Sequence, residues 1–220
     1  MINKYLNKII QGDCLEILKE LPDNSVDLVL TDPPYGIGII GKQNKASKQV
    51  NSMSKSGGHW KKYNDNEWDN NIPTKEYFNE MLRVGKNVII WGGNYFIENL
   101  FNSKCWLIWD KGKSLSLPDA ELAWTNMDKP IRLFHQTRAD AYINRVIEKE
   151  KTHPTQKPID LIKWCVENYS EEGQTILDPF LGSGTTAVAC KQLKRNYIGI
   201  ELSEEYCEIA NKRLEQDVLF

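Results

Sequence analysis

The sequence lacks a strong excess of charge, long hydrophobic runs and the apolar start of a signal peptide. Its 220 residues carry 28 Lys and Arg against 30 Asp and Glu, a formal net charge of -2. This balance excludes a globally basic nucleic-acid binder but still allows a local basic patch. Its apolar stretches span only a few residues, too short for a membrane helix. With 40% hydrophobic residues the chain can bury a core, so we expect a single domain over residues 1–220.

Paired cysteines and clustered histidines are also missing. The five cysteines are scattered along the chain, and the three histidines stand apart from one another. A disulfide framework and a zinc site both need closely spaced ligands, so neither is expected, and metal ligands are assigned to no residue. Unpaired thiols are typical of a reducing compartment, which predicts a cytoplasmic protein.

Strand-type and helix-type segments alternate along most of the chain. Strands are expected over 8–12, 26–31, 87–91, 105–109, 121–124, 130–136, 174–178 and 197–201, and helices over 14–21, 74–84, 95–101, 156–169, 185–193 and 203–215. The segments 121–124 and 130–136 are expected to form an antiparallel pair. The alternation elsewhere predicts an α/β fold, a mostly parallel sheet with helices on both faces. Residues 36–72 lose all periodicity and are expected to form a long loop.

A rigid turn follows the expected strand 26–31. Its sequence is Asp32-Pro33-Pro34-Tyr35, and the two prolines end the strand. The Asp32 carboxylate and the Pro33 carbonyl can accept the two hydrogens of an exocyclic amine, while the Tyr35 ring can stack on the heterocycle that carries it. The alternative is a proline-stiffened turn in which Tyr35 only covers the core.

A second turn joins the expected strand 174–178 to the helix after it. Residues 178–185 read Asp-Pro-Phe-Leu-Gly-Ser-Gly-Thr, and the next expected strand ends at Glu201. Glycines let a backbone pass close to a ligand, and an acid at the next strand end can bind two ribose hydroxyls. No lysine follows Gly184 and the full dinucleotide fingerprint is missing, which disfavours a phosphate loop and a nicotinamide oxidoreductase. A nucleoside cofactor is therefore favoured over a tight turn with a surface glutamate.

Together these motifs resemble the beta-class DNA amino-methyltransferases, specifically the adenine-N6 enzymes. The resemblance rests on the two turns and on residues 153–158, His-Pro-Thr-Gln-Lys-Pro, and it extends from residue 12 to residue 203. The catalytic motif comes before the cofactor glycines, which is the order of the beta class. The resemblance implies a Rossmann-like class I methyltransferase fold with circularly permuted motif order. Residues 36–72 and 110–151, the poorly matched parts, are the expected recognition loops.

The resemblance also implies a cofactor, S-adenosyl-L-methionine, and the residues around it. Asp13 is placed near its adenine and Glu201 at its ribose, while Lys157 is placed to pair with its carboxylate. The implied cofactor-binding residues are Asp13, Thr155, Lys157, Asp178, Phe180, Gly182, Ser183, Gly184, Thr185 and Glu201. The implied catalytic residues are Asp32, Pro33, Pro34 and Tyr35.

The chemistry of the Asp32 turn suits methylation of an amine. The lone pair of an adenine amine is delocalised into the ring, and two acceptors can draw the nitrogen towards a tetrahedral form that attacks a methyl group. Methylation of cytosine carbon 5 needs a nucleophilic cysteine, typically one that follows proline, and no proline here is followed by cysteine. Cytosine N4 remains an alternative because its amine fits the same acceptors, although Asp32 favours adenine. RNA as the substrate and an inactive DNA-binding subunit of the same fold are weaker alternatives.

The expected loop after Tyr35 concentrates positive charge. It contains Lys42, Lys45, Lys48, Lys55, Lys61 and Lys62 with no acidic residue between Asp32 and Asp65, a local charge of +6. Lysines beside a catalytic turn can neutralise phosphates, so these six are expected to bind double-stranded DNA, unless the loop is a solvated linker. A homodimer and a cognate restriction endonuclease are further partners that the resemblance admits, whereas no membrane contact is expected.

Overall fold

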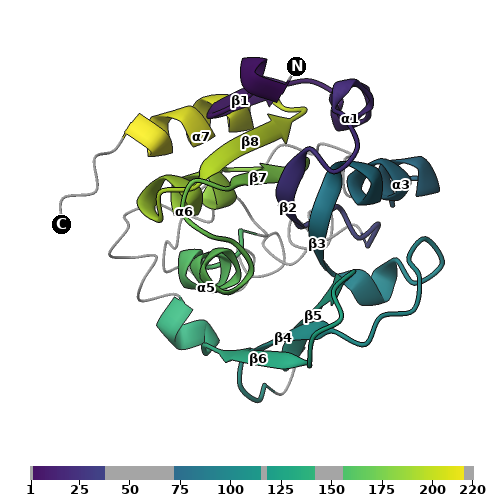
Figure 1. The fold of residues 1–220 in the computed structure, drawn as a ribbon. Helices are drawn as coiled ribbons and strands as arrows, with labels where there is room; N and C mark the ends of the chain where they lie inside the picture. The colour runs from purple at the N-terminus through teal and green to yellow at the C-terminus, as the bar shows by residue number, and fades with distance from the viewer. Residues whose placement is uncertain (1, 38–71, 115–117, 142–155, 216–220) are drawn as a thin grey trace, which may run out of the picture.

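The strands of this chain form one sheet in the order β1-β8-β7-β2-β3-β5-β4-β6 (Figure 1). The structure is a computed structural model that describes residues 2–37, 72–114, 118–141 and 156–215. The strands are β1 (Lys8–Gln11), β2 (Val26–Thr31), β3 (Gly85–Trp91), β4 (Trp106–Asp110), β5 (Ala120–Thr125), β6 (Arg132–His135), β7 (Thr175–Asp178) and β8 (Asn196–Glu201). The helices are α1 (Cys14–Glu20), α3 (Lys75–Val84), α5 (Ile159–Tyr169), α6 (Thr185–Gln192) and α7 (Glu204–Glu215), with short 3-10 helices η1 (Ile2–Lys4) and η3 (Gly93–Tyr95).

The sheet is parallel except at one strand. β1, β8, β7, β2 and β3 pair in parallel, and so do β4 and β6. β5 runs antiparallel to both of its neighbours, β3 and β4. The expectation of a mostly parallel α/β sheet is thus confirmed.

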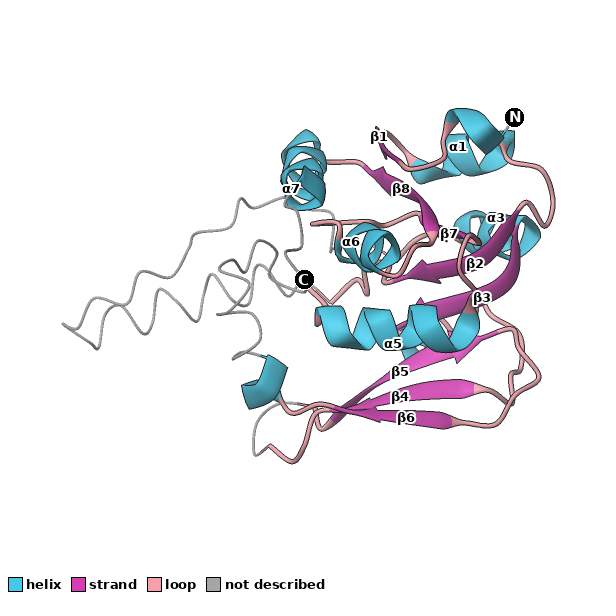
Figure 2. Cartoon of the chain, turned by 60° about the vertical axis from the view of Figure 1, so that its left-hand side comes forward, coloured by secondary structure: helices cyan, strands magenta, loops and turns pink. Residues whose placement is uncertain are grey.

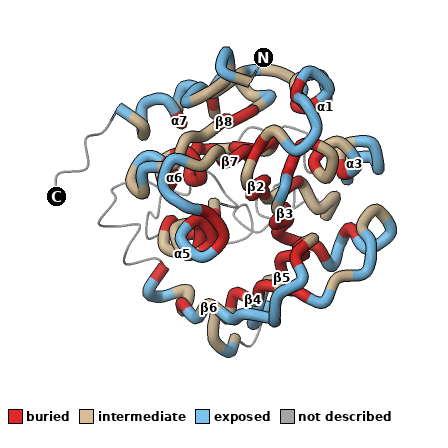
Figure 3. Tube along the Cα trace, viewed as in Figure 1, coloured by how far each residue is buried: buried red, intermediate tan, exposed pale blue. Residues whose placement is uncertain are grey.

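Helices cover both faces of this sheet, as Figure 2 shows. Alternation along β2 directs Leu28 and Leu30 into the core formed with α5 and α6, whereas Val29 packs in the core formed with α1 and α3. A third, smaller core packs Ala187 of α6 with Ala210 of α7. It lies on the same face of the sheet as α5 (Figure 2). The central strands β2 and β3 are accordingly buried over most of their length, from Leu28 to Thr31 and from Val88 to Trp91 (Figure 3).

The expected pairing of 121–124 with 130–136 is wrong. Both strands exist, but β5 lies between β3 and β4, and β6 pairs with β4 in parallel at the sheet edge. The reason is that β4 and β5 form a hairpin whose Trp124 and Ala123 are buried between two strands. β6 then has only the outer edge of β4 to pair with. The expected recognition loop 110–151 is therefore only partly loop, because its described part contains β5, β6 and a helical turn at 138–141.

The helix expected over 95–101 is also wrong. The chain forms η3 and then turns, with the Phe96 N–H donating to the Gly93 carbonyl at 3.1 Å. Phe96 is buried, but Ile97 and Phe101 are 66% and 55% exposed. This segment therefore has no continuous apolar stripe that could dock a longer helix. The remaining helices lie within a few residues of their expected bounds, and α5 begins only at Ile159 because Pro158 occupies its N-cap. No helix in the described ranges is long and apolar enough to cross a bilayer.

Candidate active site

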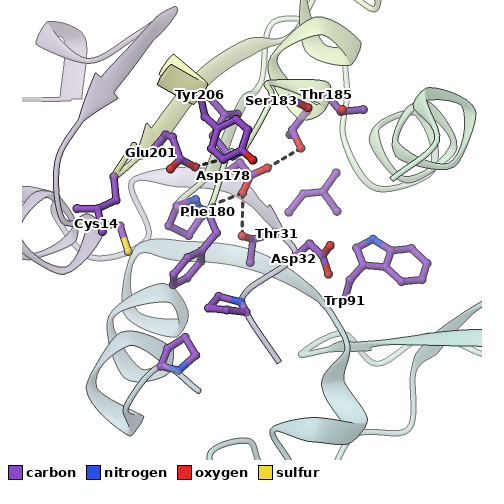
Figure 4. A pocket seen from close by; sticks show the side chains of 18 of the residues that line it. Cys14, Thr31, Asp32, Trp91, Asp178, Phe180, Ser183, Thr185, Glu201 and Tyr206 are labelled. Atoms are coloured by element: carbon purple, nitrogen blue, oxygen red, sulfur yellow. Dashed lines mark hydrogen bonds between the residues drawn. The ribbon is translucent and has the colours of Figure 1, made fainter. Parts of the chain in front are cut away.

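The two turns singled out in the sequence meet at one edge of the sheet. β2 and β7 are parallel neighbours, so the turn after Thr31 and the turn after Asp178 emerge side by side. From β2 the chain proceeds to β3 on one side, and from β7 to β8 on the other, which makes this the switch point of the sheet. The Thr31 hydroxyl donates to the Asp178 carboxylate at 2.7 Å and links the turns directly (Figure 4).

A cavity of about 810 Å³ opens between the turns. Its wall includes most of the expected catalytic and cofactor-binding residues: Asp13, Asp32, Pro34, Lys157, Asp178, Phe180, Gly182, Ser183, Thr185 and Glu201. Pro33, Tyr35 and Gly184 are not among its lining residues, and Thr155 and the six loop lysines lie outside the described residues. A volume of this size suits a small-molecule ligand.

Asp178 is buried and links the two turns through hydrogen bonds. Its carboxylate accepts the Thr31 hydroxyl, the Phe180 N–H at 3.1 Å and the Thr186 hydroxyl at 2.6 Å. Burial raises the pKa of Asp178 to about 6, although these hydrogen bonds favour its charged form. Three protein donors already occupy this carboxylate, so it shapes the cavity chiefly by holding β2, its own turn and α6 together.

The buried charge of Asp178 should make the stability of the protein depend on pH. Because the folded-state pKa of about 6 lies above the ordinary pKa of an aspartate, 3.8, the stability that protonated Asp178 supplies is fully present below about pH 4. It is lost as the pH rises through about 6. Asp178→Asn removes the charge but keeps an acceptor for Thr31 and Phe180 and a polar partner for Thr186.

We therefore expect Asp178→Asn to be more stable than the wild type at pH 7 by about 2–3 kcal/mol, with a difference near zero at about pH 4. Urea unfolding at both pH values measures this difference directly. A variant that is less stable than the wild type at pH 7 would show that the charged carboxylate is needed to hold the two turns and α6 together.

Glu201 ends β8 beside the glycine turn. One carboxylate oxygen accepts the Gly182 N–H and the other accepts the Ser203 N–H, both at 2.8 Å. Burial raises the pKa of Glu201, and the backbone donors oppose that rise. Each oxygen can accept a further hydrogen bond from the cavity, so the carboxylate could bind two adjacent hydroxyls of a ligand.

The glycines serve the turn in different ways. Gly182 has φ 55 and Gly184 has φ 87, both in the left-handed region. A Cβ on Gly184 would lie 2.6 Å from the Ala210 Cβ, so this glycine lets α6 approach α7 and does not face the cavity. Arg213 of α7 secures the same turn by donating to the Ser183 carbonyl at 2.6 Å. Arg213 could not be singled out from the sequence, because the α7 pattern shows it only as a surface cation.

Asp13 and Tyr77 form the far wall of the cavity. Asp13 caps α1 by accepting the Leu15 N–H at 2.9 Å, and the Tyr77 hydroxyl donates to it at 3.0 Å. Burial and the Asp13 carboxylate raise the pKa of Tyr77 to about 12, so its hydroxyl remains a donor. The Tyr77 ring lies 6.2 Å from the Phe180 ring, and both line the cavity. Tyr77 was missed because it lies within an ordinary amphipathic helix pattern.

The Asp32 turn is held by Tyr35. The Tyr35 hydroxyl donates to one Asp32 oxygen at 2.5 Å, and its ring stacks on Tyr95 with centroids 4.7 Å apart. Gly92, at φ 72, lies so close that an added Cβ would be 2.1 Å from the Tyr35 ring. The ring therefore packs between Gly92 and Tyr95, and Tyr95 occupies the side where a base was expected to stack. Tyr95 is 42% exposed, so little burial opposes its displacement.

Lys157 contacts the Asp32 turn. Its ammonium donates to the second Asp32 oxygen at 2.5 Å and to the Tyr35 hydroxyl at 3.2 Å, and it lies 3.2 Å from a Glu121 carboxylate oxygen. Burial opposes the charge, but Asp32 and Glu121 raise the pKa of Lys157 well above its usual range. Burial raises the pKa of Asp32, which Lys157 counteracts. The pairing of Lys157 with the cofactor carboxylate stays a prediction, and these contacts favour a place beside Asp32.

The chain is similar to known DNA methyltransferases along most of its length. A family model described as DNA methylase matches residues 103–212. The chain is 30% identical to the Type II methyltransferase M.HinfI of Haemophilus influenzae, over 98% of this chain and 70% of that protein. It is 31% identical to the Type II methyltransferase M2.MboI of Moraxella bovis, over 94% of this chain and 87% of that one.

Solved structures share the fold at lower identity. The M1.HpyAVI–SAM complex superposes with a TM-score of 0.59 at 24% identity, covering 95% of this chain and 99% of that one. The cytosine-N4-specific PvuII DNA methyltransferase gives 0.59 at 15% identity, covering 96% of this chain and 87% of that one. Because sequence identity and the order of the motifs extend over nearly the whole chain, it belongs to the DNA methylase family of N6 and N4 methyltransferases.

Proposed function

We propose that this protein transfers a methyl group from S-adenosylmethionine to the N6 amine of an adenine at a specific sequence in double-stranded DNA. The observation that carries the proposal is that Asp32, the acceptor for the amine, lines the same cavity as Glu201, the acceptor for ribose hydroxyls. A donor and an acceptor of a methyl group must meet within bonding distance, and a shared cavity provides that meeting point.

The charges of the cavity suit S-adenosylmethionine. Asp13, Asp32, Asp178 and Glu201 line it, against one lysine, Lys157. Such a site favours a ligand with net positive charge. Glu201 would bind the ribose, and Asp13, Tyr77 and Phe180 would enclose the base of the cofactor. When bound, the cofactor supplies a methyl group on a positively charged sulfur.

The residues of the turn then position the target amine. Asp32 and the Pro33 carbonyl accept its two hydrogens, which frees the nitrogen lone pair. Both Asp32 oxygens have protein partners in this structure, so the amine must replace Tyr35 or Lys157 on one of them. After transfer the nitrogen carries one proton too many, and the Asp32 carboxylate lies in place to accept it. Tyr95 must leave the Tyr35 ring if the flipped base is to stack there.

The DNA-binding part of the proposal rests on sequence. Lys42, Lys45, Lys48, Lys55, Lys61 and Lys62 follow the catalytic turn directly but lie outside the described residues. We assign them to phosphate contacts. We assign sequence recognition to residues 36–72 and to the loop parts of 110–151, and we propose that residues 1–220 form a single domain. The names of the relatives support a restriction-modification setting. A cognate endonuclease, a homodimer and a cytoplasmic location belong to this proposal.

Replacing Lys55, Lys61 and Lys62 together with glutamine should weaken DNA binding and flatten its salt dependence by up to about 3 units of slope. S-adenosylmethionine affinity should stay the same, because these lysines are assigned to phosphates. Binding titrations on one duplex at several salt concentrations measure the slope. An unchanged slope would move the DNA contacts to the segment 129–145.

The proposed function itself is tested by expressing the protein in a host that lacks DNA methylation and mapping modified bases by sequencing. We expect N6-methyladenine at one short recurring sequence. N4-methylcytosine at such a sequence would show that the cytosine amine is the target instead. An unmodified genome, together with a purified protein that does not bind S-adenosylmethionine, would favour an inactive DNA-binding subunit.

A further inference from the structure

We propose that Glu121 is a positioning residue for the catalytic carboxylate, and that it acts by giving Lys157 a second acid to bind when a substrate amine occupies Asp32. The inference rests on the proposed transfer of a methyl group to an exocyclic amine. Glu121 does not line the cavity, and Lys157 pairs with both Glu121 and Asp32.

The reversed strand explains why Glu121 lies near the site. In β5 Ala123 is opposite Trp91, the last residue of β3, so the start of β5 lies beyond the carboxyl end of β3. Glu121 therefore shares the sheet edge from which the Asp32 turn emerges. Side chains two residues apart point to the same face, and Ala123 and Trp91 both pack in the core beneath α5. Lys157 precedes α5 and meets Glu121 on that face.

The four charged side chains form an alternating chain. Asp32 binds Lys157, Lys157 pairs with Glu121, and Glu121 pairs closely with Lys111. The two lysines are nearly buried, at 8% and 10% exposed, so neither charge is balanced by water. Two acids and two bases make the cluster neutral, and removing one member leaves a buried charge unpaired.

Glu121 has acceptor capacity that the present contacts do not use. Its Oε2 atom is buried and receives no well-directed hydrogen bond from the described residues, although Lys157 lies 3.2 Å away. Lys157 donates instead to Asp32 at 2.5 Å. A small shift of the ammonium from Asp32 to Glu121 would free an Asp32 oxygen for the amine without exposing an unpaired lysine. Without Glu121, Lys157 has only Asp32 and Tyr35 and competes with the substrate.

The same geometry predicts a change in pH dependence. The charged groups that act on Asp32 are Lys157, Tyr35 and Glu121, and Asp178 lies in the adjoining turn. Lys111 pairs with Glu121, and the charge of Arg138 acts on Lys111. The negative charge of Glu121 raises the pKa of Asp32. Removing that charge lowers the pKa of Asp32, so the acid limb of the activity profile moves to lower pH.

Glu121→Gln is the direct test. We expect kcat to fall about ten- to hundredfold, the acid limb to move to lower pH, and the cofactor affinity to stay within about twofold. Asp110→Asn is the matched control, because Asp110 lies on the neighbouring strand and binds Gly112 and His135 but not Lys157. The control should keep the wild-type kcat and pH profile.

A second variant separates positioning from folding. Glu121→Gln with Lys111→Met removes one acid and one base, so the buried cluster stays neutral. We expect this double variant to unfold near the wild-type temperature but to keep the low kcat and the shifted acid limb. A folded variant, single or double, with wild-type kcat and pH profile would overturn the inference. Absence of transfer by the wild type would overturn the proposed function and this inference with it.

Discussion

Replacing Asp32 with alanine should reduce methyl transfer to DNA by at least about a hundredfold, because the variant loses the acceptor that orients the amine. S-adenosylmethionine affinity should stay within a few-fold of the wild type. The cofactor is assigned to the Glu201 side of the cavity, and Lys157 keeps Glu121 as an acid partner after the substitution. Single-turnover transfer from labelled cofactor measures the first quantity, and calorimetric titration measures the second.

Asp27→Ala is the matched control for this result. Asp27 lies on the same strand at its other end, where it pairs with Lys86 and accepts the Thr175 N–H. The control should lose some stability but keep its rate of transfer. A folded Asp32→Ala protein that methylates DNA at a near-normal rate would remove Asp32 from the catalytic role.

Replacing Glu201 with alanine should weaken S-adenosylmethionine binding about ten- to hundredfold. A buried hydrogen bond to a charged acceptor contributes about 1.5–3 kcal/mol, which corresponds to that range of affinity. At saturating cofactor the transfer rate should change far less, because Glu201 is remote from the amine. Calorimetry gives the affinity, and the rate at saturating cofactor gives the second value.

Glu204→Ala is a suitable control, since Glu204 is exposed at the start of α7 and does not line the cavity. Glu201 also accepts two backbone N–H groups of the turn, so thermal unfolding of both variants should accompany the titration. Unchanged cofactor affinity in a folded Glu201→Ala protein would exclude Glu201 from the cofactor site.

The fold could be predicted where local signals and burial agree. β2 is a short apolar run ended by two prolines, and α1 ends before Pro22, so both elements lie within one residue of their expected bounds. The pairing of β5 could not be predicted, because sequence shows that a strand is buried but not which neighbours bury it. The segment 95–101 contains apolar residues, yet Ile97 and Phe101 face outwards.

The candidate site divides in the same way. Acids and glycines that follow parallel strands could be predicted, since the carboxyl ends of such strands meet at one edge. Glu121 was missed because it stands at the amino end of an antiparallel strand, and only the reversal brings that end to the site. Tyr95 was missed because it lies in the segment expected as a helix, although it stacks directly on Tyr35. Glu121 and Tyr95 belong to the site because of contacts with other elements, and the position of a residue in the sequence does not show such contacts.

The most direct test of the central claim uses purified protein, S-adenosylmethionine with a labelled methyl group and unmethylated duplex DNA. After transfer the DNA is digested to nucleosides and the labelled product is identified by chromatography and mass. We expect label in N6-methyldeoxyadenosine with the wild type and a loss of that label with Asp32→Ala. Label in another nucleoside, or no label from a folded protein that binds the cofactor and the DNA, would contradict it.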